Sequence, residues 1–137
     1  MSTPPLWKDQ GPINIPQYST EPVQLSPEVE VDLDIPAKLI LGKRVEFFFA
    51  YYIENFTSDN LVAQNVVIRG ERTTIGEIDF LIQNREKEEV THVELVYKFY
   101  LFDQETDSWI GPNRNDSLTK KLNHLQNHQI PLLHREE

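Results

Sequence analysis

Acidic side chains interrupt several apolar stretches of this sequence, and they are the residues best suited to chemistry. Glu77 and Asp79 are two residues apart in TTIGEIDFLIQ, and Glu94 precedes Lys98 by four residues in VTHVELVYKFYLF. Side chains alternate across a β-strand, so Glu77 shares a face with Asp79, and Glu94 shares a face with Lys98. Because the apolar Val96 also lies on that second face, the parity indicates either a lined cleft or a solvated polar face.

A further acidic residue, Glu46, lies in the apolar segment AKLILGKRVEFFFAYYIENF. Apolar residues with helical spacing predict a long helix there, from about residue 36 to residue 56. Its predicted inner stripe consists of Leu41, Val45, Phe48, Tyr52 and Phe56, widened by Phe49 and Ile53. Glu46 lies at the edge of this stripe, either as a functional carboxylate or as a surface side chain that reaches water.

The pattern of apolar residues also predicts the strands and the second helix that position these acids. Segments near residues 61–69, 73–83 and 90–102 are rich in β-branched and aromatic residues and predict an antiparallel meander of three strands. A second helix begins near Asn115 or Asp116, either of which can cap it, and ends at Pro131. The sequence therefore predicts a mixed α/β domain (α+β), with the long helix packed on a three- to four-stranded mixed sheet and the second helix close by.

The sequence gives little support for thiol chemistry or for a zinc site. There are no cysteines, which excludes disulfides, thiolate metal sites and a cysteine nucleophile, and fits a reducing compartment. His124 and His128 are four residues apart, but the sequence offers no third ligand, so a solvated helix face is favoured over a zinc site. No segment has the ~20 apolar residues that cross a bilayer, and no signal peptide is evident, so we expect a cytoplasmic protein without membrane contact.

The chain of 137 residues is long enough for one compact domain, and its charge is uneven. Seven of the nine prolines fall in the first 37 residues, which carry one basic and six acidic side chains. We predict an acidic arm over residues 1–34, either loose or laid along the domain, followed by a domain over residues 35–137. The arm could contact a protein partner or a second copy. The net charge of -9 opposes long-range attraction to nucleic acid, although residues 109–128 are locally basic.

The order of these motifs resembles a known superfamily. The chain is similar to the PD-(D/E)XK phosphodiesterase superfamily, which includes many restriction and recombination nucleases. The similarity lies in the order of LGKRVE in a helix, QNVVIR, GEIDFLI and HVELVYK in strands, and then a basic helix. The resemblance covers about residues 39–129. More narrowly, GEIDFLI, HVELVYKFYL, WIGPN and DSLTKKLNHLQNHQIPLL resemble an uncharacterised bacterial family, domain of unknown function eighteen fifty-three.

The superfamily resemblance implies a metal site with particular residues. Asp79 matches its aspartate, Glu94 the acid of the next strand, and Glu46 the glutamate of the first helix. These carboxylates would hold Mg²⁺ or Mn²⁺, with the Leu95 carbonyl as a further ligand. A lysine near the metal would orient or deprotonate the attacking water.

The sequence departs from the superfamily pattern in two places. The usual lysine would stand at position 96, which is Val96, whereas Lys98 is about 13 Å along the strand from Glu94 instead of about 6.6 Å. Lys98 remains on the expected face, and a bulge could shift its register. The core as expected from this chain also lacks the strand that the superfamily adds after its second helix.

Two functions follow from these observations. In the first, the protein is a metal-dependent nuclease acting on DNA or RNA, with Glu46, Asp79 and Glu94 on the metal and Lys98 on the water. Lys120 and Lys121 would then meet backbone phosphates. In the second, it is a catalytically degenerate member of the fold that binds a protein or nucleic acid without cleaving it. The displaced lysine and the net charge favour the second, and the three matched acids favour the first.

Overall fold

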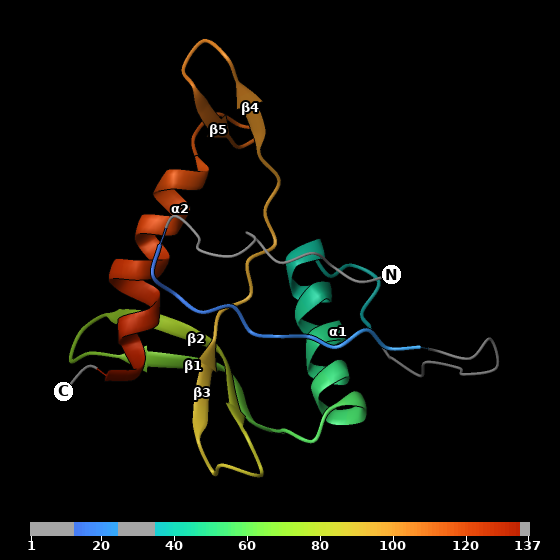
Figure 1. The fold of residues 1–137 in the computed structure, drawn as a ribbon. Coiled ribbons are helices and arrows are strands. Elements are labelled where there is room, and N and C mark those ends of the chain that lie inside the picture. The colour runs from blue at the N-terminus through green and yellow to red at the C-terminus, as the bar shows by residue number, and fades with distance from the viewer. Residues whose placement is uncertain (1–12, 25–34, 135–137) are drawn as a thin grey trace.

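The computed structural model describes residues 13–24 and 35–134 of the chain. Figure 1 shows a small sheet with one helix on each side, and a hairpin that projects away from them. The elements in chain order are α1 (Leu41–Phe56), β1 (Asn60–Arg69), β2 (Thr74–Gln83), β3 (Val90–Val93), β4 (Leu101–Asp103), β5 (Ser108–Ile110), α2 (Leu118–His124), η1 (Leu125–Gln129) and η2 (Ile130–His134). None of the helices in these ranges is long and apolar enough to cross a membrane.

The sheet is an antiparallel meander in the order β1-β2-β3, which confirms the predicted strand order. Short turns reverse the chain between its strands. The Gly70 N–H donates to the Thr73 carbonyl at 2.8 Å, and the Asn84 N–H donates to the Glu89 carbonyl at 2.9 Å. Because such turns join only antiparallel neighbours, the expectation of a mixed sheet is wrong. Strands β4 and β5 form a separate two-stranded hairpin.

The third strand is much shorter than the sequence pattern predicted. Pairing with β2 stops at Val93, and residues 94–100 have no regular secondary structure before β4 begins. In Figure 1 this segment runs upward between α1 and α2 to the β4–β5 hairpin. The alternation predicted for residues 90–102 therefore does not extend past β3, and it cannot place Lys98 beside Glu94.

Helix α1 packs through only one side of the predicted stripe, the side that carries Phe49 and Ile53. Ile53 is fully buried, and the Phe49 ring meets the buried Phe80 ring edge-on with centroids 4.9 Å apart. The predicted stripe residues Leu41, Phe48 and Phe56 are exposed instead. Every residue from 47 to 53 is apolar or aromatic, so the periodicity could not single out one face.

The observed inner face of α1 carries Glu46 toward the sheet. Glu46 precedes Phe49 by three residues and Ile53 by seven, which places all three on one side of a helix. The core that this face covers consists of Ile53, Phe80, Ile82 and Val93.

The described part of the N-terminal arm contacts α1 through residues near Tyr18 and Glu21. The Tyr18 ring meets the Phe49 ring at 5.7 Å, and its hydroxyl donates to an Asp59 carboxylate oxygen at 2.8 Å. The Glu21 N–H donates to the Tyr52 hydroxyl at 2.8 Å. These contacts fit an arm laid on the domain, while residues 1–12 and 25–34 of the predicted arm lie outside the described residues.

The second helix begins and ends later than predicted. Ser117 caps α2, because its hydroxyl accepts the Lys120 N–H, and Asp116 only supports it by accepting the Ser117 N–H. The helical path continues through η1 and η2 past Pro131, the predicted end. A Cβ at Gly76 would lie 2.7 Å from a methyl carbon of Leu132, so the missing side chain lets η2 pack directly on β2.

We predict that Ile53→Ala lowers the free energy of unfolding by about 3 kcal/mol, because it removes most of a fully buried side chain under the core. Leu41→Ala is the matched control. Leu41 is 56% exposed, and we expect its replacement to change stability by less than about 0.5 kcal/mol. Urea denaturation followed by circular dichroism measures both values. Equal losses would contradict the observed orientation of α1.

Candidate functional site

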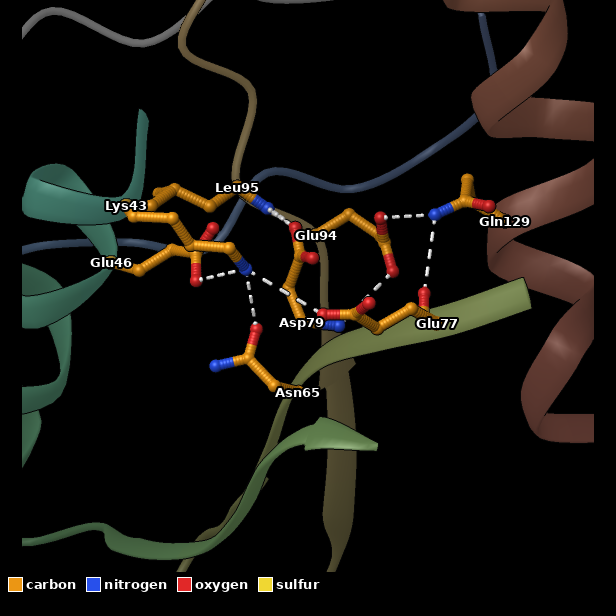
Figure 2. A network of polar contacts seen from close by, with 8 residues as sticks. All are labelled: Lys43, Glu46, Asn65, Glu77, Asp79, Glu94, Leu95 and Gln129. Carbon is orange, nitrogen blue, oxygen red and sulfur yellow. Dashed lines mark hydrogen bonds and ion pairs between the residues drawn. The ribbon is translucent and has the colours of Figure 1, made fainter. Parts of the chain in front are cut away.

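The candidate site lies where β2 and β3 separate. Phe80 and Val93 are the last residue pair of the ladder, and beyond it carboxylates take the place of carbonyl acceptors. The Leu95 N–H donates to Asp79 Oδ2 at 2.9 Å, and the Asp79 N–H points at Glu94 Oε1 at 3.4 Å. Figure 2 shows the two acids side by side between the helices. This exchange explains why β3 ends at Val93.

Glu94 is held on its other side by two polar side chains. His92 Nε2–H donates to Glu94 Oε1 at 2.7 Å, and the Gln129 amide donates to Glu94 Oε2 at 2.9 Å. Burial acts to raise the pKa of Glu94, but these hydrogen bonds outweigh it and hold the pKa below its ordinary value. The side chains of His92 and Glu94 are 4% and 5% exposed. This depth excludes a solvated polar face.

Lys43 of α1 brings a positive charge to the site. Its ammonium donates to Glu46 Oε2 at 2.7 Å and to Asn65 Oδ1 at 2.8 Å, and lies 3.6 Å from Glu77 Oε1. Burial acts to lower the pKa of Lys43, but the hydrogen bond and charge of Glu46, with the charges of Glu77 and Asp79, raise it. Figure 2 shows the ammonium between α1 and the strands.

The negative charge of Asp79 is only partly compensated by its neighbours. Burial raises its pKa to about 6, the Leu95 N–H opposes the rise, and the negative charges of Glu94 and Glu46 add to it. Lys43 counteracts the rise through its positive charge. Figure 2 shows Lys43, Glu46, Asp79 and Glu94 in one polar network. The structure therefore gathers the three predicted acids, Glu46, Asp79 and Glu94, in one place.

The predicted lysine is elsewhere. Lys98 Nζ pairs with Asp116 Oδ2 at 3.1 Å, and Tyr100 donates to the same oxygen at 3.3 Å. Within the described ranges, no hydrogen bond or ion pair joins Lys98 to the gathered acids. Lys120 is exposed and Lys121 partly exposed on α2.

Carboxylate oxygens are the donors that Mg²⁺ and Mn²⁺ prefer, so the gathered acids fit a divalent ion by their chemistry. In residues 13–24 and 35–134, however, no three His, Asp or Glu side chains are already arranged as a metal-binding group. Their oxygens meet Lys43, the Leu95 N–H, His92 and Gln129 instead. Leu95 takes part through its N–H, and its carbonyl has no contact that marks it as the predicted ligand.

A comparison with protein families covers the residues that form this site. A family model described as "Domain of unknown function (DUF1853)" matches residues 16–137. The chain belongs to this family. The resemblance to the family that its motifs indicated is thereby confirmed. No curated protein and no solved structure matches the chain.

The DUF1853 match starts at residue 16, so it takes in the described arm segment that carries Tyr18 as well as the site. Part of the predicted arm thus belongs to the family's domain.

The DUF1853 site includes residues that the sequence analysis missed. Lys43 precedes Glu46 by three residues, a spacing at which opposite charges pair on a helix, so a pattern existed for it. Asn65 has a left-handed backbone (φ 54°), which asparagine tolerates better than most residues, but no sequence signal tied it to Lys43. No sequence signal singled out His92 or Gln129 as partners of Glu94.

We predict that Asp79→Asn stabilises the metal-free DUF1853 domain at pH 7 by about 1 kcal/mol. Each pKa unit corresponds to about 1.4 kcal/mol, and partial solvent access reduces the effect. The folded pKa lies above the unfolded one, so deprotonating wild-type Asp79 costs stability as the pH rises from about 4 to 6. The gain should therefore be full at pH 7 and absent below pH 4, where both forms are neutral. Thermal denaturation in EDTA measures it.

Asp107→Asn makes the same chemical change at an exposed turn residue with positive φ, and it serves as the control. We expect no pH-dependent gain from it. An equal gain from both variants would show that the effect comes from the overall charge of -9 and not from the site.

Proposed function

We propose that this DUF1853 domain is a metal-dependent phosphodiesterase of the nuclease type, with a core like that of the PD-(D/E)XK superfamily. The order α1, β1, β2, β3, α2 supports this proposal, as does the all-antiparallel path of the three strands. Glu46 lies on α1, Asp79 on β2 and Glu94 directly after the end of β3, and this chain order of the three acids also supports the proposal.

The single observation that carries the proposal is the meeting of these three acids. They come from α1, from β2 and from the segment after β3, and they are up to 48 residues apart in sequence, yet they lie in one polar network, as Figure 2 shows. Gathering like charges costs stability, so a fold that does so without a ligand would gain from replacing one of them. A divalent cation would offset that cost.

The reaction is hydrolysis of a phosphodiester. A water oxygen attacks phosphorus, the bond from phosphorus to one sugar oxygen breaks, that oxygen gains a proton, and the water loses one. The products are a phosphate monoester and a hydroxyl. Glu46, Asp79 and Glu94 would hold Mg²⁺ or Mn²⁺, which polarises the phosphate and lowers the pKa of the water. His92 and Gln129 fix the orientation of Glu94 from behind.

We expect the wild-type protein to cleave single- or double-stranded DNA or RNA in Mg²⁺ or Mn²⁺, and EDTA to stop it. Asp79→Asn and Glu94→Gln should each lower the cleavage rate at least about 100-fold, because each removes a charged ligand. Mn²⁺ should also raise the melting temperature of the wild type but not of Asp79→Asn. Gel-based cleavage assays and thermal-shift titration measure these effects.

Asp107→Asn again controls for loss of one surface charge, and it should cleave at the wild-type rate. Cleavage that survives Asp79→Asn unchanged would come from a contaminating nuclease or another site. If the wild type cleaves none of these substrates in either metal, the proposed function is wrong.

A second candidate function is a degenerate domain that binds nucleic acid without cleaving it. The observation that favours it is that the site's oxygens already have partners within the protein, together with Val96 at the position of the usual lysine. Binding would then rest on Lys120 and Lys121, which are accessible on α2.

For this second function, Lys120→Ala and Lys121→Ala should each flatten the dependence of log binding constant on log salt concentration by about one unit, because each phosphate contact releases about one counterion. Fluorescence anisotropy with a labelled oligonucleotide measures the slope. Lys87→Ala, at an exposed turn residue, is the control and should leave it unchanged. Slopes that stay the same in all three variants would contradict this mode of binding.

A further inference from the structure

The hydrogen bonds of Lys43 leave part of its ammonium available. An ammonium has three N–H donors. Glu46 and Asn65 accept two of them, at 2.7 and 2.8 Å, and Glu77 at 3.6 Å is too far for a hydrogen bond. Within the described ranges, the third N–H therefore has no hydrogen-bond acceptor.

The surroundings of Lys43 are open on one side. The side chains of Lys43 and Glu77 are 41% and 42% exposed, while those of His92 and Glu94 at the far side of the site are nearly buried. The Lys43 side of the site is therefore the more exposed one, whereas Gln129 closes the other side by donating to Glu94 and to the Glu77 carbonyl.

The backbone holds Lys43 in this place. Asn65 lies in β1 between Gln64 and Val66, which pair with Phe80 and Ile78 of β2, so Asn65 lies across from Asp79. Its left-handed backbone accompanies the side-chain contact that ties β1 to α1. The ammonium is thus fixed from the helix and from the strand next to the central acid, as Figure 2 shows.

We propose that Lys43 is the lysine of this site, in the role that Lys98 cannot reach from its pair with Asp116. The inference rests on the proposed function. Glu46, Asp79 and Glu94 would hold the divalent ion. The third N–H of Lys43 would donate to a non-bridging phosphate oxygen of the nucleic acid, where its charge would offset the charge that develops during attack by water. It transfers no proton. Being held by Glu46 and Asn65, it needs little reorganisation.

The test compares Lys43→Met, Lys43→Arg and Lys98→Met with the wild type, and uses Lys87→Met as the matched control at an exposed turn. Methionine keeps the apolar stem of lysine and removes the charge. Two readouts are needed: the cleavage rate at saturating Mn²⁺, and the affinity for Mn²⁺ without nucleic acid, measured by calorimetry.

We expect Lys43→Met to cleave at least about 100-fold more slowly, because it loses a donor to the transition state, and Lys43→Arg to recover part of the rate. Lys43→Met should also bind Mn²⁺ about tenfold more tightly, because a neighbouring positive charge no longer repels the ion. Lys87→Met should match the wild type in both measurements.

A wild type that cleaves, with Lys43→Met as fast and Lys98→Met slowed, overturns the inference and leaves the proposed function standing. A wild type that cleaves no nucleic acid contradicts the proposed function. In that case a tighter Mn²⁺ affinity of Lys43→Met still supports Lys43 as the cation of this site, and an unchanged or weaker affinity overturns it.

Discussion

Two backbone amides at the end of the β2–β3 ladder donate to carboxylates, and the rest of the site depends on this exchange. A buried N–H needs an acceptor, and beyond Phe80 and Val93 the strands no longer supply carbonyls to each other. Asp79 accepts the Leu95 N–H, and Glu94 receives the Asp79 N–H. The backbone is satisfied, but two negative charges now lie between the strands. Such charges are costly unless other groups compensate them, so the neighbouring elements must supply donors and a cation.

Those compensating groups come from both ends of the domain. Lys43 approaches from α1 near the start of the described core, and Gln129 approaches from η1 near its end. Each depends on packing that has no part in the polar network. Phe49 and Ile53 set the rotation of α1 that turns its Lys43 and Glu46 side toward the strands, and the absence of a side chain at Gly76 lets Leu132 pack on β2 beyond η1. The glycine of the GEID motif thus serves the site through packing, since a Cβ there would push η2 and with it Gln129 away.

The sequence predicted what depends on local pattern. The three strands and their antiparallel order follow from periodicity and short turns. So do the positions of Glu46 on a helix and Asp79 on a strand, whereas Glu94 follows directly after the third strand. The inner face of α1 was predicted too broadly, because the unbroken apolar run from 47 to 53 does not distinguish the buried Phe49 and Ile53 from the exposed Phe48. The end of β3 was missed for another reason: the pattern continues past Val93, but a side-chain acceptor at Asp79 competes with the ladder. Because the strand ends at Val93, the alternation of side chains no longer places Lys98 on the same face as Glu94. The lysine that reaches the acids is Lys43, which comes from α1.

Burial acts on both central acids, yet the pKa of Glu94 falls and the pKa of Asp79 rises. The two sides of the site therefore differ in how well negative charge is stabilised. Glu94 has donors on both oxygens, so its charge is stabilised and its pKa falls, whereas Asp79 has one backbone donor and two acidic neighbours, so its pKa rises. The unbalanced negative charge therefore lies at Asp79, on the side where Lys43 and Glu77 are exposed. A cation gains most there. The net charge of -9 repels a polyanion at long range, so a phosphate can be held only by positive charge close to it. Among the described residues, Lys43 is the cation whose charge acts on Asp79, and it has a donor to spare. Binding of the ion and of the phosphate should therefore be coupled through that one side chain.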